Sequence, residues 1–201
     1  KNGMIRQLLD TKKCPNCDLC GADLNGEDLS GANLRGANLS EADLTETNLS
    51  GANLTDADLT VASFNRANLD GANLDGANLS GAGLSGLDLS GKDFRGTTLI
   101  GTSLTGTNLS GVDLSGKDLT RALLMEANLS GANLSGADLT DTRLHAANLN
   151  GAKLSGANLT DADAGGDANL SGANLTDADL PDASFDGVNL DGANLSGAIL
   201  S

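Results

Sequence analysis

The sequence predicts an all-β solenoid that follows a short helix, and three observations lead to this fold class. A Leu or Phe occupies nearly every fifth position from Leu19 through Leu159, and the series resumes at Leu170 and continues to Leu200. Neither an α-helix nor a flat strand places side chains at this spacing on one buried face. The chain has no Trp, no Tyr and only three Phe, so Leu and Ala must fill its core.

The repeat unit reads Ala, Asn or Asp, Leu, Ser or Thr, Gly, as in residues 132–136. On an α-helix, five residues turn the side chain by about 500°, so the Leu positions would spread around the helix. On a flat strand, an odd step sends successive Leu side chains to opposite faces. Ala and Leu both point inward if a three-residue extended piece precedes a two-residue corner. At the corner Gly relaxes the φ restriction, and Ser or Thr can bond to local backbone.

This pattern resembles the pentapeptide repeat family, whose motif is A(D/N)LXX, over residues 17–201. The uniform repeat and the lead-in Leu-Leu-Asp-Thr-Lys-Lys-Cys are similar to the cyanobacterial and plastid-lumen branch. The resemblance implies a right-handed quadrilateral β-helix of about nine coils that pair in parallel. Four repeats would then close one coil, a number that the periodicity alone does not fix.

Residues 1–16 are predicted to form a capping helix and a Cys-containing junction, and residues 17–201 the β-helix. The apolar residues of the leader recur at helical spacing on one stripe and are Met4, Ile5, Leu8 and Leu9. We therefore expect a short helix that covers the first coil, because a solenoid must protect its exposed ends. A disordered leader is the alternative.

Three cysteines lie at this junction. Cys14 is in phase with the Leu positions and Cys17 takes an inward Ala position, so their side chains should face each other. Cys20 replaces a corner Ser and should face outward. We expect a Cys14–Cys17 disulfide that joins the cap to the coil, a bracket that the resemblance to lumenal family members also implies.

Zinc, a redox-active CxxC motif and buried thiols are the alternatives for these cysteines. Structural zinc needs four ligands, and the single His, His145, is far away in the sequence. A thioredoxin-like motif needs a βαβ context that this chain lacks. The disulfide implies an oxidising compartment, a thylakoid lumen or periplasm, with the cytoplasm as the alternative location.

The repeat slips by one residue at 165–167. We expect a local bulge that leaves Ala168 and Leu170 inward, because a one-residue shift would otherwise expose every later Leu. Other residues replace inward Ala mainly between positions 87 and 117. Inward Thr hydroxyls should bond to the backbone, and Lys92 and Lys117 should lie along the wall with their ammonium groups in water. An anion site inside the coils is the alternative for these lysines.

One cluster of outward side chains departs from the repeat, and its members are Leu123, Met125, Arg143 and His145. If residues 20 apart are vertical neighbours, Leu123 lies beneath Arg143, and Met125 beneath His145. Such a cluster is interpreted either as a patch that docks a partner or as neutral variation at tolerant positions.

A column of carboxylates is predicted on the adjoining corner, from Asp141, Asp161 and Asp182. Hard cations prefer clusters of oxygen ligands, so a weak calcium site is one interpretation. A solvated acidic edge is the other. We expect no resident metal and no cofactor.

Composition excludes several classes of function. The chain has 12 Lys and Arg against 27 Asp and Glu, a net charge of −15, which argues against direct binding of nucleic acid. No apolar run approaches the roughly 20 residues that span a bilayer, so membrane insertion is not expected. The Ser and Asp residues follow the repeat, and His145 occupies an outward corner, so we expect no enzyme activity.

A non-enzymatic structural or protein-interaction rod with an unknown protein partner is therefore the predicted function. The alternative, implied by gyrase-protecting members of the family, is a DNA mimic that binds a type II topoisomerase. B-DNA carries about one charge per 1.7 Å. This chain would carry about one charge per 3 Å of its length if its coils are spaced by ~4.8 Å. Its charge density is therefore lower than that of the duplex it would mimic.

The last coil, residues 185–200, presents an open disc of Leu190, Leu195 and Leu200. Uncovered backbone at such an end promotes further pairing, and neither a helix nor a charged cap follows in the sequence. We expect a tail-to-tail homodimer through this coil. A cap outside this sequence is the alternative.

Overall fold

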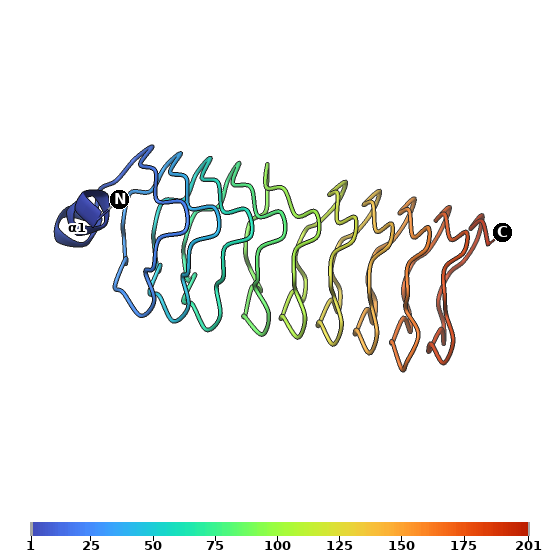
Figure 1. The fold of residues 1–201 in the computed structure, drawn as a ribbon. Helices are drawn as coiled ribbons and strands as arrows, with labels where there is room; N and C mark the ends of the chain where they lie inside the picture. The colour runs from blue at the N-terminus through green and yellow to red at the C-terminus, as the bar shows by residue number, and fades with distance from the viewer. Residues whose placement is uncertain (1, 201) are drawn as a thin grey trace. The chain divides into compact units, whose positions relative to one another are not determined.

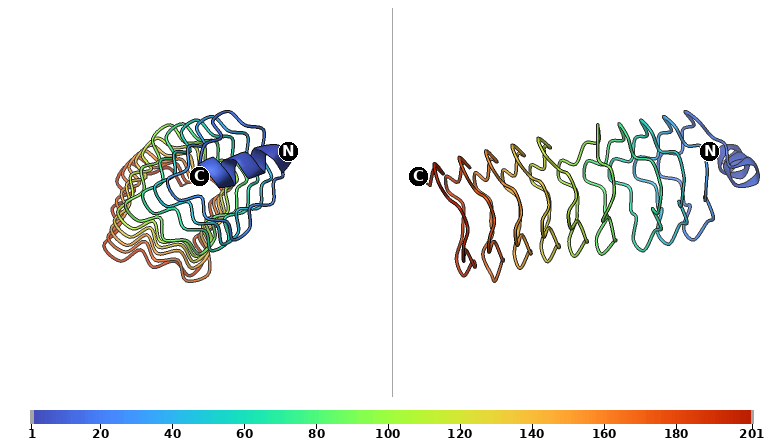
Figure 2. Two further views of the ribbon diagram at one scale, coloured as in Figure 1. Left: turned by 90° about the vertical axis from the view of Figure 1, so that its left-hand side faces the viewer. Right: turned by 180° about the vertical axis from the view of Figure 1, so that it is seen from behind.

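The computed structural model describes residues 2–200 and contains one helix, α1 (Asn2–Thr11), followed by a chain of short extended pieces and turns (Figure 1). Isolated parallel bridges join most extended pieces to the piece one coil away, as between Lys13 and Asn33 and between Asn33 and Asn53. Except around the slip at 165–167, the bridged residues are 20 positions apart, so four repeats make one coil. The coils form a right-handed quadrilateral β-helix, which confirms the predicted fold class (Figure 2).

The chain divides into two compact units, and each unit is β-helical by itself. Unit 1 comprises Lys1–Leu87 and Lys92–Thr98, and unit 2 comprises Asp88–Gly91 and Leu99–Ser201. The division falls in the part of the sequence where inward positions depart most from Ala.

Each corner is a β-turn that one backbone hydrogen bond closes. The N–H of the inward residue after the turn donates to the carbonyl of the preceding Leu, as from Ala132 to Leu129 at 3.0 Å. The residue between them, Gly131, has a φ of 65°, as the third position of a type II turn requires. Gly recurs at this position because it adopts a positive φ without steric strain.

Outward Asn and Asp side chains also hold the corners, a role that the repeat pattern suggested only for Ser and Thr. The Oδ1 of Asn33 accepts the N–H of Arg35 at 3.2 Å, which is an Asx-turn. Asp28 accepts the Ser30 N–H at 3.0 Å in the same way. The Ser30 hydroxyl and N–H hold the pKa of Asp28 below its ordinary value, because they stabilise the charged carboxylate.

Leu and Ala fill the core of each unit, and Phe64 and Phe94 are buried with them. Where Thr replaces inward Ala, its hydroxyl donates to a main-chain carbonyl, as from Thr107 to Leu104 at 2.6 Å. This confirms the expected role of the inward Thr residues. Across residues 2–200, no buried side-chain nitrogen or oxygen lacks a hydrogen-bond partner.

The slip at 165–167 is absorbed in one turn, as predicted. Ala168 and Leu170 are buried. The interval between bridged residues changes from 20 to 21, as in the bridge between Asn148 and Asn169. The extra residue therefore stays in the corner, and the later Leu residues keep their inward phase.

The Cys14–Cys17 disulfide is present, as predicted, with a Cα–Cα distance of 5.3 Å. Cys14 is fully buried beside α1, and its Sγ lies 3.7 Å from the carbonyl oxygen of Met4. Leu8 of α1 is also fully buried. The helix and the disulfide therefore cover the first coil of unit 1 together.

Lys92 differs from its expected placement. The side chain is half-buried in unit 1, and its ammonium donates to the main-chain carbonyls of Leu69 and Ala72, in the second case at 3.2 Å. The carbonyls hold this ammonium, which therefore does not project freely into water. Burial lowers the pKa of Lys92 because the charged form loses hydration, and Asp70 opposes this shift.

Replacing Lys92 with Met should lower the free energy of unfolding at pH 7 by about 1 kcal/mol, because Met keeps the apolar stem but leaves the carbonyls of Leu69 and Ala72 without the ammonium donor. The folded-state pKa of Lys92 lies below the ordinary value of 10.5, so the unfolded chain binds more protons between the folded-state pKa and 10.5. Wild-type stability therefore rises with pH there, and the difference in unfolding free energy between the two proteins should widen at pH ~10. Urea denaturation at both pH values measures this, with the exposed Lys153→Met as control. A variant as stable as the wild type at pH 7 would contradict the prediction.

Removing the disulfide by a Cys14→Ser, Cys17→Ser double substitution should lower the free energy of unfolding by about 2 kcal/mol, the loop-closure value for so short a loop. Alkylation of the unreduced, denatured wild-type protein should add one label per chain, at Cys20. Intact-mass spectrometry counts the labels. Three labels on the unreduced protein would refute the disulfide.

Candidate functional site

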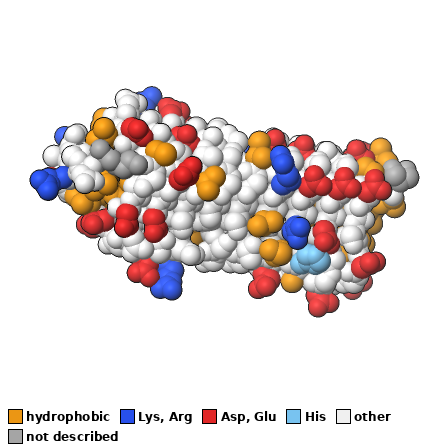
Figure 3. Space-filling model, in the orientation of Figure 1, with side chains coloured by type: hydrophobic (Ala, Val, Ile, Leu, Met, Phe, Trp, Pro, Cys, Tyr) orange, Lys and Arg blue, Asp and Glu red, His pale blue; other side chains and the backbone are white. Residues whose placement is uncertain are grey.

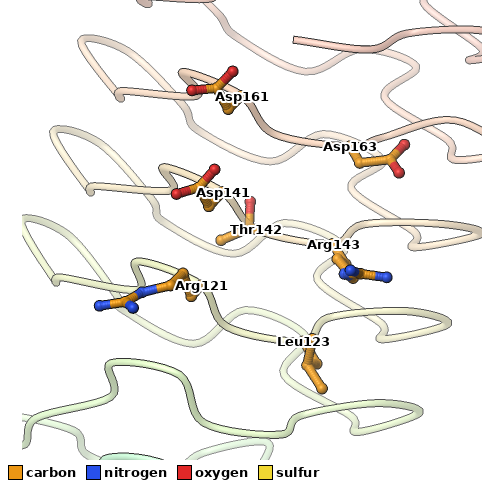
Figure 4. A pocket seen from close by; sticks show the side chains of 7 residues that line it. All are labelled: Arg121, Leu123, Asp141, Thr142, Arg143, Asp161 and Asp163. Carbon is orange, nitrogen blue, oxygen red and sulfur yellow. The ribbon is translucent and has the colours of Figure 1, made fainter.

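A surface depression of about 520 Å³ lies in unit 2 (Figure 4). Its lining residues come from three successive coils and are Arg121, Leu123, Asp141, Thr142, Arg143, Asp161 and Asp163. Only Thr142 of these is fully buried, so the depression is lined mainly by outward side chains.

Two columns of side chains border the depression. The corner column consists of Arg121, Asp141 and Asp161, and the face column of Leu123, Arg143 and Asp163 (Figure 4). Parallel bridges join Leu123 to Arg143 and Arg143 to Asp163, so these three residues are vertical neighbours.

The corner column is stacked by the backbone in the same way. The N–H of Arg121 donates to the Thr140 carbonyl at 2.9 Å, and that of Asp141 donates to the Thr160 carbonyl at 3.0 Å. Arg121, Asp141 and Asp161 have φ values of 60°, 57° and 55°. These corners hold charged side chains where most corners hold Gly.

The structure brings together the four residues of the predicted patch in two adjacent coils. Leu123 and Arg143 are paired directly, as expected. Met125 and His145 follow them by two residues in the same coils, and the N–H of Glu126 donates to the His145 carbonyl at 2.8 Å. Figure 3 shows the single His beside hydrophobic, basic and acidic side chains.

Arg121 was missed by the sequence reasoning, although it was detectable. It precedes Asp141 by 20 residues, so the coil period places it in the predicted carboxylate column. We define the unit 2 patch as this residue together with the sequence-predicted cluster and the charged residues of the depression: Arg121, Leu123, Met125, Asp141, Arg143, His145, Asp161 and Asp163.

The slip packs against His145. The Nε2 of His145 lies 2.8 Å from the Oδ2 of Asp163, while the Oδ1 of Asp163 accepts the Gly165 N–H at 3.2 Å. Gly166 has a φ of 63°, and a Cβ there would lie 3.1 Å from the Nδ1 of His145. The positive φ and the imidazole ring beside it therefore both favour Gly at position 166.

Asp141, Asp161 and Asp182 stack on one corner, since the Asp161 N–H donates to the Pro181 carbonyl at 3.0 Å. However, no three His, Cys, Asp or Glu side chains within residues 2–200 are grouped so that they could hold a metal ion. The calcium interpretation of this column therefore gains no support.

Also within residues 2–200, no helix is long and apolar enough to cross a membrane.

Fold and repeat define a class of protein, the right-handed β-helices with five-residue repeats. The sequence model of the family described as pentapeptide repeats matches this chain, with 8 copies. The matched residues are 14–51, 42–81, 77–116, 105–141, 122–161 and 166–201. The chain belongs to the pentapeptide repeat family.

Several solved structures resemble the chain. HetL, a pentapeptide repeat protein involved in heterocyst differentiation regulation from the cyanobacterium Nostoc sp. strain PCC 7120, is 32% identical, with a TM-score of 0.59, over 98% of this chain and 93% of HetL. QnrB1, a plasmid-mediated fluoroquinolone resistance protein, is 21% identical over 90% of this chain and 87% of its own, with a TM-score of 0.47.

A protein from the Arabidopsis thaliana thylakoid lumen is 28% identical over 68% of this chain and 71% of its own, with a TM-score of 0.16. No curated protein matches the chain.

Replacing Asp163 with Ala should lower the free energy of unfolding by about 1 kcal/mol, because the Gly165 N–H and His145 both lose a partner. Asp163→Asn keeps the Oδ1 acceptor and should lower the free energy of unfolding by less than half as much. Thermal denaturation compares the two, with the exposed Asp167→Asn as control. Equal losses for the Ala and Asn variants would show that the acceptor does not hold the slip.

Proposed function

We propose that this protein is a non-enzymatic scaffold that binds a protein partner through the unit 2 patch. The observation that carries the proposal is the gathering of large, chemically varied outward side chains around one depression. Most other outward positions carry the Asn, Asp, Ser and Thr of the repeat. Varied side chains at exposed positions of a regular scaffold are typical of binding surfaces.

The chemistry of the patch supports binding rather than catalysis. The one hydroxyl group among the residues lining the depression belongs to Thr142, and it donates to the Leu139 carbonyl at 2.7 Å. It is buried, so it does not face the depression as a nucleophile. His145 is held by Asp163 at the slip, where the pair connects two coils.

The similarity to HetL agrees with this proposal. HetL is involved in the regulation of heterocyst differentiation, and a protein contact is one means by which a scaffold can act in regulation. DNA mimicry toward a type II topoisomerase is the second hypothesis. It is less well supported, because the exposed Arg121 and Arg143 interrupt the negative surface that a duplex mimic needs.

Two further parts of the proposal concern location and assembly. The Cys14–Cys17 disulfide supports an oxidising compartment, which would be a thylakoid lumen or periplasm. In the last coil, Leu195, Ile199 and Leu200 are 36%, 55% and 69% exposed. A homodimer through this coil stays a prediction.

A photo-crosslinking residue at Met125 tests the proposed function in the source cells. Thr45 provides the control, because it occupies the equivalent corner in unit 1 and is also half-buried. We expect Met125, and not Thr45, to yield a discrete protein adduct. No adduct at Met125, or the same adducts at both positions, would contradict the proposal.

A further inference from the structure

The charged groups of the unit 2 patch point to a partner of defined chemistry. We infer that the patch recognises a protein segment of mixed charge, with an acidic side chain over Arg121 and Arg143 and a basic side chain over Asp141 and Asp161. This inference rests on the proposed function, since it specifies which partner the same patch binds.

The arginines of the two units differ in their partners. In unit 1, each arginine of the repeats has a carboxylate partner, and the three ion pairs are Arg35–Asp56 at 3.6 Å, Arg66–Glu46 at 2.6 Å and Arg95–Asp93 at 2.6 Å. In unit 2, Arg121 and Arg143 are exposed and form no ion pair with any residue in 2–200. Both border the same depression, so two uncommitted guanidinium groups face one surface.

The carboxylates of the depression divide in a similar way. Asp163 is committed to His145 and to the Gly165 N–H. Asp141 and Asp161 are exposed, and within the described part of the chain no hydrogen bond or ion pair engages their carboxylates. Two positive and two negative groups therefore remain available in one patch.

The arrangement of these four groups is ordered along the coils (Figure 4). Arg121 lies on the first coil of the depression, Asp141 and Arg143 on the second, and Asp161 on the third. Coils paired in parallel are about 4.8 Å apart, so the groups extend over about 10 Å. In an extended segment, residues two positions apart are about 6.6 Å apart and point to the same face, so two flexible charged side chains of such a segment can reach groups on adjacent coils.

A segment of mixed charge fits this surface better than a uniformly charged one. The net charge of −15 attracts a basic group from solution, but the two arginines repel a second basic group beside it. Asp141 and Asp161 likewise repel the second carboxylate of a purely acidic segment. Such paired attraction and repulsion confers specificity and register more than affinity. Leu123, half-buried in the face column below Arg143, offers an apolar contact.

Three synthetic peptides of equal length test the inference on the full chain. The mixed peptide is acetyl-Gly-Leu-Glu-Ser-Lys-Gly-amide, and in the other two both charged residues are Glu or both are Lys. Isotope-labelled protein titrated at low ionic strength reports binding through amide shifts. We expect the mixed peptide to shift the patch amides and to bind at least about fivefold more tightly than either control.

Charge-neutralising variants complete the experiment. Arg121→Asn with Arg143→Gln, and Asp141→Asn with Asp161→Asn, should each reduce binding of the mixed peptide to the level of the controls. Asn is suited to the corner positions because it tolerates a positive φ. Arg66→Asn in unit 1 is the matched control, since Arg66 also occupies a corner with a positive φ, and it should leave binding unchanged.

The outcomes separate this inference from the proposed function. If no peptide binds, if the all-Lys or all-Glu peptide binds as tightly as the mixed one, or if the variants bind unchanged, the inference is overturned. A Met125 adduct that persists in both charge-neutralised variants would also overturn it, while the proposed docking function would stand. A missing adduct at Met125 contradicts the docking function itself.

Discussion

The backbone ladder between residues 20 apart is the interaction on which the rest of this structure depends. Within each unit, neighbouring coils pair their N–H and C=O groups, which satisfies polar groups that would be costly to bury unpaired. The same pairing stacks the inward side chains, most of them Leu, one above another. Burial of Leu and pairing of backbone therefore favour one geometry, and a change of phase would disturb both at once.

This constraint explains where the sequence is uniform and where it varies. Inward positions must be small or must satisfy their own polar atoms, so Thr107 returns its hydroxyl to a carbonyl and Lys92 donates its ammonium to two. Corners need a positive φ, which Gly accepts most easily. Outward positions bear no packing constraint, and there Asn and Asp cap the turns. Large side chains at such positions, as at Leu123 and Arg143, are not required by the fold.

Because the ladder has a fixed period, a binding surface is distributed through the sequence at intervals of 20 residues. Arg121, Asp141 and Asp161 are distant in sequence, yet the coils stack them in one column. The slip alters this interval to 21 without altering the stack, since the extra residue stays in a turn beside His145. A solenoid can therefore vary one patch of its surface while its core remains unchanged.

The sequence, together with the four repeats per coil that its family resemblance implies, determined the fold class, the inward phase of Leu, the Cys14–Cys17 pair, the absorbed slip and the stacking of Leu123 on Arg143. A five-residue period and a coil of four repeats leave each side chain one direction to face. Only the tertiary structure decided that Asn and Asp hold the corners, that Lys92 bonds to Leu69 and Ala72, and that Arg66 is paired while Arg121 and Arg143 are not. The physical reason is that periodicity specifies direction, whereas a hydrogen bond or an ion pair depends on distances of a few ångströms between neighbouring coils.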